Sequence, residues 1–466
     1  MVYSASALKR LFNKIKKKLK NSSFFIFFVF TPSAFSIPNS GTYFLYLPIN
    51  TFLWLTTSFF TLLVFVKYFF LQEIRFSFRA YAFILSILFL FNIIILKNAL
   101  LQEYYFFLLV LLFLIFFFWS VWQIRWKEIN LQSVLWALFA VGVWQALVAL
   151  IQTFDQFGIA YYWTGYWPFK INNHGPIGVF QQINILATFL VTSLLISFYL
   201  MISPRIFSLP RLIRWGLWLA VGLIFYVLFI TGSRSGLLAL IIGVPLIHIA
   251  RFYWVRKQPG LVILWWALLF TALMLAWFYP ASGRGIGLAS NKMSEVVSGT
   301  DVRWFLYTQS FLAFLEAPWF GHGLGQFTPA FVEVASQNLD QTNMKPEILQ
   351  TFTHPHNELL FWMVQSGVIA LIAGVGLFFG YLYSAFKHFR WRYALSLFAI
   401  SSPIWVHSML SYPFSLSAPH LFLLLFLIAV STSGGLRTVH FQCPTWVKSL
   451  IIFSAITAAS LATFAA

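Results

Sequence analysis

The sequence predicts an all-α membrane protein that crosses the bilayer many times. Of its 466 residues, 60% are hydrophobic and only 9% are charged, and the mean hydropathy is +0.82. Apolar stretches of about 18 residues or more recur along the chain, which is the length that a membrane helix needs. Only helices or closed barrels can satisfy their backbone groups in lipid, and runs this long and apolar indicate helices.

Reading these stretches in order predicts about 12–13 transmembrane helices and one large external loop. The bilayer core is about 30 Å thick, so each helix needs about 20 apolar residues. The first stretch is short and contains Pro32; with its basic start and small-residue end it is either a cleaved signal peptide or, as we favour, a retained signal-anchor. The expected helices lie near residues 23–38, 49–70, 80–97, 104–122, 131–152, 177–202, 215–233, 235–251, 261–280, 357–386, 393–410, 417–434 and 447–465.

The distribution of Lys and Arg predicts how these helices are oriented. If the basic N-terminal stretch, residues 8–20, is cytoplasmic and the connections alternate, 23 of the 30 Lys and Arg residues fall on the cytoplasmic side. Basic loops resist translocation, so this asymmetry supports the alternation. The formal charge of +19 therefore reflects membrane topology, and no nucleic-acid partner is expected. The single cysteine, Cys443, excludes an intramolecular disulfide and a CxxC metal site.

The polar residues concentrate on the external side. Nine of the eleven acidic residues are external in this topology, and six of them lie between Glu295 and Glu347. A connection as long as residues 281–356 is usually functional or disordered, and its apolar pattern predicts a small structured cap with one or two helices. We expect four segments: N-terminal transmembrane helices (1–152), further transmembrane helices with external signature loops (153–280), the large loop (281–356) and C-terminal transmembrane helices (357–466).

Two external arginines are candidates for binding an anion. Arg234, in TGSRSG, either extends to lipid headgroups or holds a phosphate beside flexible glycines and a helix N-terminus. Arg303, in GTDVRWFLYTQ, falls in the first turn of an expected helix, where its charge opposes the helix dipole. That position indicates a partner anion, with an ordinary salt bridge as the alternative.

The stretch THPHNE places His354, His356, Asn357 and Glu358 directly before a long apolar run. One interpretation makes Asn357 a helix cap and the histidines hydrated interface residues. A second forms a metal site from His354 and His356 with His322 or Glu358, although an HxH pair alone is a weak signal. The third is catalytic: a neutral histidine accepts the proton of a hydroxyl.

The sequence lacks the GxSxG, P-loop and paired-carboxylate patterns of other enzyme classes. Two external arginines, a histidine and a membrane-embedded cavity suit the transfer of a group from a lipid-linked phosphate donor to a hydroxyl. A transporter is the alternative from another class, but it predicts polar residues through the span centres, whereas these spans are nearly free of charge.

Four local patterns carry a resemblance to the O-antigen ligase and O-oligosaccharyltransferase superfamily, also called Wzy-C. His356-Asn357 followed after nine residues by Gly367 resembles the family's histidine motif, and TGSRSG resembles its arginine turn. The stretch DVRW…APWFGHGLGQF is similar to its external-loop segment. GVFQQINILAT resembles a signature of PglL-type protein glycosylation ligases, as does VHSMLSYP at residues 406–413.

The resemblance implies a GT-C-like, metal-independent glycosyltransferase of the bacterial inner membrane, with its active site facing the periplasm and no cofactor. The expected donor is an oligosaccharide on undecaprenyl pyrophosphate, and the acceptor is a Ser or Thr hydroxyl of a periplasmic protein such as a pilin. In the O-antigen ligase alternative the acceptor is lipid A core, and in the polymerase alternative it is another glycan. The chain departs from the family pattern at Gln365, Ala370 and Ser411, which bears on the acceptor more than on the reaction.

The resemblance also assigns roles to residues. His356 is expected to be the catalytic proton acceptor, because it matches the histidine motif, with His354 and His322 as alternatives. Arg234 and Arg303 are expected to bind the pyrophosphate. The residues expected to position the substrate are Gln182, Asn184, Arg284, His322, His354 and Asn357.

Overall fold

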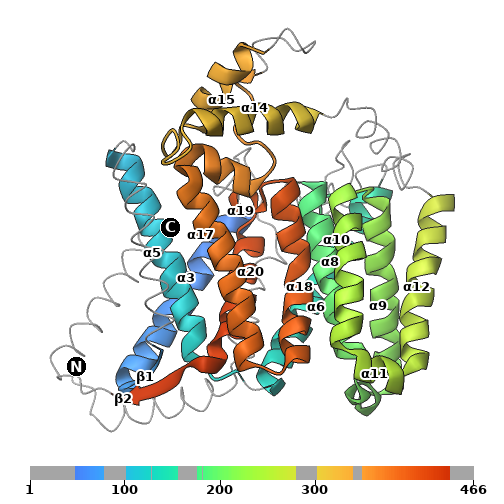
Figure 1. Ribbon diagram of the computed structural model, residues 1–466. Helices are drawn as coiled ribbons and strands as arrows, with labels where there is room; N and C mark the ends of the chain where they lie inside the picture. Colours follow the sequence, from blue (N-terminus) through green and yellow to red (C-terminus); the bar gives the residue numbers. More distant parts are fainter. Residues whose placement is uncertain are drawn as a thin grey trace, which may run out of the picture.

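The protein is a bundle of long helices with a small helical cap at one end (Figure 1). The computed structural model describes residues 48–77, 101–126, 128–155, 176–180, 182–279, 302–338 and 349–440. The predicted spans near 23–38, 80–97 and 447–465 lie outside these residues, as do Arg284 and Cys443. The α-helices are α3 (Pro48–Leu71), α5 (Leu101–Gln123), α6 (Glu128–Phe154), α8 (Ile183–Met201), α9 (Arg211–Ile230), α10 (Arg234–Ala250), α11 (Phe252–Lys257), α12 (Pro259–Phe278), α14 (Val302–Glu316), α15 (Phe327–Ser336), α17 (Glu358–His388), α18 (Trp391–Leu410), α19 (Pro413–Leu416) and α20 (Ala418–Thr432).

The all-helical fold class is confirmed: besides the α-helices, the described residues contain two short 3₁₀ helices and one small two-stranded ribbon. Pro204–Ser208 forms the short 3₁₀ helix η4, and Ser433–Gly435 forms η7. The strands β1 (Glu73–Phe76) and β2 (Arg437–His440) pair antiparallel, with Glu73 opposite His440. Four-residue strands carry too little alternation to be recognised in the sequence.

Within the described residues, seven helices of 18 residues or more are apolar enough to cross a membrane, and three apolar helices are shorter. All ten coincide with predicted spans, so the chain is a multi-pass membrane protein. Helix α8 lies at the centre, and every residue from Ile185 to Met201 is buried against α6, α9, α10 and α18. An apolar helix with no polar face is expected in such a surrounded position.

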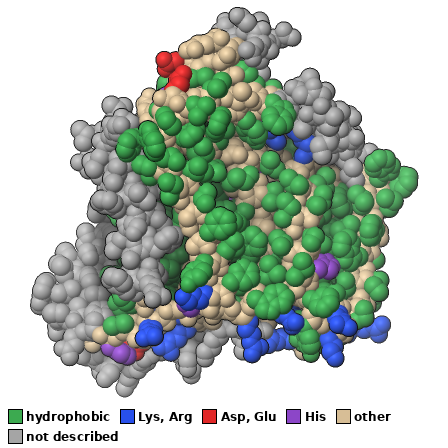
Figure 2. Space-filling view, viewed as in Figure 1, with side chains coloured by type: hydrophobic (Ala, Val, Ile, Leu, Met, Phe, Trp, Pro, Cys, Tyr) green, Lys and Arg blue, Asp and Glu red, His purple; other side chains and the backbone are tan. Residues whose placement is uncertain are grey.

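The connections predicted to be cytoplasmic meet at one end of the bundle, called the basic end below. The β1–β2 ribbon joins the segment after α3 to the segment after α20. The Arg75 guanidinium donates to the carbonyls of Trp122 (2.8 Å), Ile124 (2.7 Å) and Ser433 (2.8 Å), which ties the end of α5 to the same point. Figure 2 shows Lys and Arg side chains gathered along this end, as the topology requires.

The cap stands over the opposite end of the bundle (Figure 1). Helices α14 and α15 pack on the first half of α17 through a separate hydrophobic cluster that includes Leu306, Phe331 and Val364. The start of α17, the end of α18 and the start of α10 therefore lie beneath or beside the cap, and the candidate site is built from them.

Candidate active site

A break in α17 fixes the cap to the membrane bundle. At Gly367 the backbone leaves the helix, with φ 66° and ψ −155°, so the predicted span is two helices that meet at this residue. The freed groups find partners on the cap turn: His322 N–H donates to the Val364 carbonyl (3.0 Å) and Val368 N–H to the Pro318 carbonyl (2.7 Å). A break in lipid is tolerated where neighbouring protein satisfies the backbone in this way.

Glycine is required at both sides of this junction. Gly321 and Gly367 have φ of 69° and 66°, in the left-handed region that side chains rarely adopt. A Cβ on Gly367 would overlap the backbone of Trp319, and one on Gly321 would overlap the backbone of Gln365. The Gln365 side chain completes the contact by accepting from Gly325 N–H (2.6 Å). The glycines of both the histidine motif and the external-loop segment therefore serve one close backbone contact.

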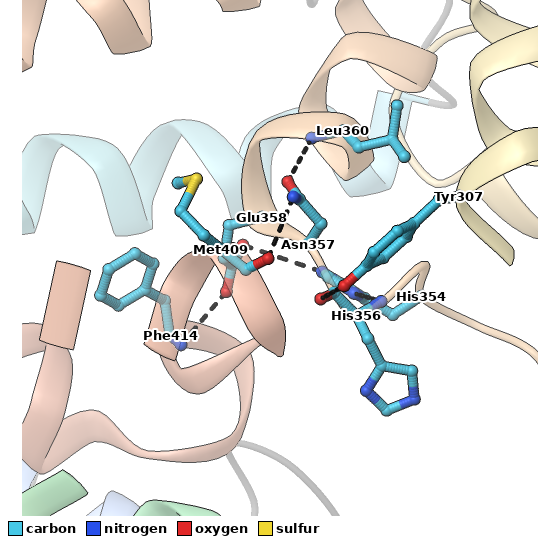
Figure 3. A network of polar contacts seen from close by, with 8 residues as sticks. All are labelled: Tyr307, His354, His356, Asn357, Glu358, Leu360, Met409 and Phe414. Carbon is cyan, nitrogen blue, oxygen red and sulfur yellow. Dashed lines mark hydrogen bonds and ion pairs between the residues drawn. The ribbon is translucent and has the colours of Figure 1, made fainter. Parts of the chain in front are cut away.

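His356 is held at the mouth of α17 by its backbone (Figure 3). Its φ is 59°, an uncommon conformation for a residue with a side chain. Its N–H donates to Nδ1 of His354 (2.9 Å), and its carbonyl accepts from the Tyr307 hydroxyl (3.3 Å). The next residue, Asn357, caps α17 by accepting from Leu360 N–H (2.9 Å) and donates to the Met409 carbonyl (3.1 Å). In Figure 3 the His356 imidazole lies outside this network, so the backbone is fixed while the ring projects from it.

His354 supports this loop from a buried position. Its ring stacks between Phe361 (centroids 4.3 Å apart) and Tyr412 (4.4 Å), and only 5% of the residue is exposed. Burial lowers the pKa of His354 to about 3, so the ring is neutral near pH 7. Because Nδ1 accepts from His356 N–H, the proton of the neutral ring is on Nε2, which lies 3.8 Å from the Glu358 carboxylate.

Glu358 is itself buried at the start of α17. Its Oε1 accepts from Phe414 N–H (3.2 Å), which connects α17 to the corner between α18 and α19. Tyr412, at the same corner, lies against the His356 ring with centroids 5.1 Å apart. The start of α17 and the end of α18 therefore form one wall of the site.

Arg303 reaches this site from the cap. It is the second residue of α14 and lies one turn before Tyr307, on the same face of the helix, and the Tyr307 hydroxyl contacts His356. Both Arg303 and His356 lie within electrostatic range of the buried His407 on α18. The structure therefore places Arg303 and His356, which are 53 positions apart, on the same side of the site, with Tyr307 between their backbones.

Arg234 begins α10 next to a polar turn. Ser233 caps the helix by accepting from Gly236 N–H (3.2 Å), and its hydroxyl donates to the Asn184 side chain of α8 (2.7 Å). A Cβ atom on Gly236 would lie 2.7 Å from the Cβ of Ala187, so glycine at this position allows α10 to pack closely on α8. The half-buried Arg234 is thus placed beside α8 by the serine and glycine that flank it.

His407 links these two halves of the site, and sequence reasoning gave it no role. The Thr188 hydroxyl donates to the Asn184 carbonyl (2.8 Å), so its oxygen accepts from Nδ1–H of His407 (2.8 Å). Nε2 then carries the lone pair and, among the described residues, this buried atom has no hydrogen-bond partner. The signal in the sequence was a histidine inside an apolar span, in VHSMLSYP, which is a functional candidate by position alone.

The other predicted residues have different surroundings. The Gln182 side chain lies near the Tyr412 hydroxyl, so the start of α8 faces the same corner. His322 is farther up, in the cap junction, where its Nε2 contacts the Ala313 carbonyl (2.7 Å). No group of three or more His, Cys, Asp or Glu side chains within the described ranges is arranged to hold a metal ion. Arg284 lies outside those ranges.

Comparison with known proteins agrees with the motifs. Residues 219–375 match the family model described as O-Antigen ligase, a range that includes Arg234, Arg303, His356 and Gly367. The chain is 25% identical over 305 residues to the general O-oligosaccharyltransferase of Acinetobacter baylyi. The matched segment covers 62% of this chain and 48% of that protein. It thus spans about half the length of the curated relative it matches. These two matches confirm the resemblance to the PglL-type oligosaccharyltransferases of the O-antigen ligase superfamily.

Proposed function

We propose that this protein is a glycosyltransferase that moves an oligosaccharide en bloc from a polyprenyl-pyrophosphate carrier, undecaprenyl pyrophosphate, to a Ser or Thr hydroxyl of a periplasmic protein such as a pilin. The observation that carries the proposal is the contact of the Tyr307 hydroxyl with the His356 carbonyl, which brings the start of α14, with Arg303 one turn earlier, to the histidine loop at the same end of the bundle as Arg234. A cationic, membrane-level site beside a histidine ring suits a donor whose charged group lies at the lipid headgroups.

The proposed reaction is a single displacement at the anomeric carbon. The acceptor oxygen forms the new glycosidic bond as the bond between the sugar and the pyrophosphate breaks, which inverts the anomeric centre. His356 accepts the hydroxyl proton, and polyprenyl pyrophosphate leaves with the bonding electron pair. Arg234 and Arg303 stabilise the charge that develops on the leaving group, a type of contact whose loss typically costs 10²–10³ in rate.

Contacts of the other histidines support His356 as the proton acceptor. Nδ1 of His354 is occupied by His356 N–H, and its other nitrogen carries the proton. The ring of His322 is tied to the Ala313 carbonyl in the cap. The imidazole of His356 projects away from the network that holds its backbone (Figure 3). In this scheme the acceptor hydroxyl approaches the ring from that side.

The remaining residues are proposed to position these groups or the substrate. His354 and Asn357 set the backbone of His356, and Asn184 sets the turn that holds Arg234. Gln182, beside Tyr412, is placed to contact sugar or acceptor. We also keep Arg284 and His322 as substrate-positioning candidates. No metal or cofactor has a role in this scheme.

The acceptor class and metal independence are tested in one reconstitution. Purified protein is mixed with lipid-linked oligosaccharide, EDTA, and either a pilin-like protein or lipid A core. We expect a glycoprotein product that is unaffected by EDTA. Modification of lipid A core alone would make the protein an O-antigen ligase, extension of the lipid-linked glycan would make it a polymerase, and donor translocation without a product would indicate a transporter.

A further inference from the structure

A cavity of about 400 Å³ opens at the basic end of the bundle, away from the candidate active site. It lies between α6, the end of α8, η4 and the start of α9. A volume of this size is typical of small-ligand pockets. The lining residues are Gln132, Trp136, Leu200, Ser203, Arg205, Ile206, Ser208, Leu209, Ile213 and Leu217.

The lining is divided along the direction in which the helices cross the membrane. On α6, Gln132 lies at the shallow end and Trp136 one turn, about 6 Å, deeper. On α9, the apolar residue Leu217 lies about 9 Å deeper than Arg211, which begins the helix. The remaining polar groups belong to Ser203 and to η4, outside the apolar spans. The cavity is therefore polar at the membrane surface and apolar toward the bilayer core.

The shallow end is also cationic. Arg205 lines the cavity and donates to the Gln132 side chain, while Arg211 and Arg214 follow within nine residues in PRIFSLPRLIR, which contains no acid. Arg214 lies over the ring of Phe207, 5.4 Å from its centroid. Such a basic pocket between membrane helices is suited to an anionic headgroup.

We infer that this cavity binds one anionic phospholipid of the leaflet at the basic end. The phosphate contacts Arg205 near Gln132, and the first carbons of one acyl chain lie along Trp136, Ile213 and Leu217. A zwitterionic lipid offers the same chain but adds a positive charge beside the arginines, so the site favours phosphatidylglycerol over phosphatidylcholine. A free phosphate lacks the chain that fills the apolar part.

Native mass spectrometry of the full chain, with phosphatidylglycerol and phosphatidylcholine at equal concentrations, tests this inference. We expect one tightly retained phosphatidylglycerol on the wild type. Arg205→Gln is expected to weaken its retention about fivefold, the effect of one basic residue at a membrane surface. The matched control is Arg256→Gln, which removes an exposed charge of α11 at the same end but does not line the cavity.

A second variant tests the apolar part of the cavity without changing any charge. Leu217→Trp fills the apolar part and leaves Arg205 in place, so it is expected to release the lipid as well. Equal retention of both lipids by the wild type, or equal retention by Arg205→Gln and Arg256→Gln, would overturn the inference. Displacement of phosphatidylglycerol by millimolar inorganic phosphate would also overturn it, since the site would then recognise phosphate alone.

Discussion

Arginines at the two ends of the bundle occupy opposite electrostatic positions. At the basic end, Arg75 donates to carbonyls where α5 and α20 finish, so its charge complements the negative ends of those helices. At the other end, Arg234 is the first residue of α10 and Arg303 the second of α14, so each cation lies at a positive helix end. The first arrangement stabilises the fold, whereas in the second the charge opposes the helix dipole, a cost that the pyrophosphate of the proposed function would offset.

The largest expected effect is that of His356→Ala. Loss of the proton acceptor should reduce transfer 10²–10⁴-fold while the protein folds normally, because the backbone contacts of residue 356 do not use its ring. The matched control is His440→Ala, which changes an exposed histidine on β2 at the basic end. Initial rates of glycan transfer by both variants measure the difference.

The comparison of the arginines predicts opposite effects on transfer rate and on stability at the two ends of the bundle. Arg234→Gln and Arg303→Gln should each lower the transfer rate about 10²–10³-fold and leave the thermal unfolding midpoint unchanged or slightly raised. Arg75→Gln should lower the unfolding midpoint and leave the transfer rate unchanged, because it removes the guanidinium that donates to three backbone carbonyls. Rates and unfolding midpoints of the three variants are measured together; a destabilised Arg234→Gln with normal turnover would show that this arginine is structural.

The glycine junction joins the cap, which carries Arg303, to the membrane bundle. Gly367→Ala places a side chain at positive φ, which costs about 1–3 kcal/mol before its overlap with Trp319 is counted. We expect a lower unfolding midpoint and impaired transfer, since the cap that carries Arg303 is displaced. Gly376→Ala, in the second half of the same helix with no atom within 4 Å of the added Cβ, should leave both unchanged.

A smaller effect is expected at His407. His407→Phe keeps the ring volume but removes the hydrogen bond to Thr188, whose contribution of about 1 kcal/mol corresponds to roughly fivefold. If His407 positions the arginine turn through Thr188 and Asn184, kcat should fall more than KM rises. Thr188→Val should reproduce the fall in kcat, and the double variant His407→Phe/Thr188→Val should have a kcat no lower than either single variant. Additive losses would show that the two residues act independently.

The smallest expected effect is on pH dependence. The pKa of His354 is lowered to about 3 in the folded protein, so burial favours its neutral form. The contribution of this residue to the free energy of unfolding is therefore fully present above its ordinary pKa of about 6.5. It is lost progressively as the pH falls from about 6.5 toward 3, because the unfolded state then binds a proton that the folded state does not. Unfolding midpoints between pH 7.5 and 5 should decline less steeply for His354→Phe, which keeps the stack with Phe361 and Tyr412; parallel curves would contradict this.

The sequence predicted features that depend on neighbouring residues, and it missed features that depend on contacts between distant parts of the chain. Apolar length located the helices, because bilayer thickness leaves few alternatives. Asn357 was recognised as a possible cap from its place before an apolar run, and the structure confirms that cap. The break at Gly367 was not recognised, because it depends on the backbone of residues 318–323 arriving from another part of the chain.

The candidate site shows the same division. His356 and Arg234 stand in local patterns that could be read directly, although their roles remain predictions. The contact between His407 and Thr188 joins positions 219 apart, and no local pattern records it. The lowered pKa of His354 likewise follows from two aromatic rings, one of them 58 positions away, that bury the imidazole.

The division of roles between the histidine and the arginines is tested most directly by measuring donor binding and transfer in the same reconstituted samples. Wild type, His356→Ala and the double variant Arg234→Gln/Arg303→Gln are incubated with lipid-linked oligosaccharide and acceptor. We predict that His356→Ala binds the donor as wild type does but transfers the glycan 10²–10⁴-fold more slowly, and that the double variant fails to bind the donor. Transfer by His356→Ala at the wild-type rate would contradict the account.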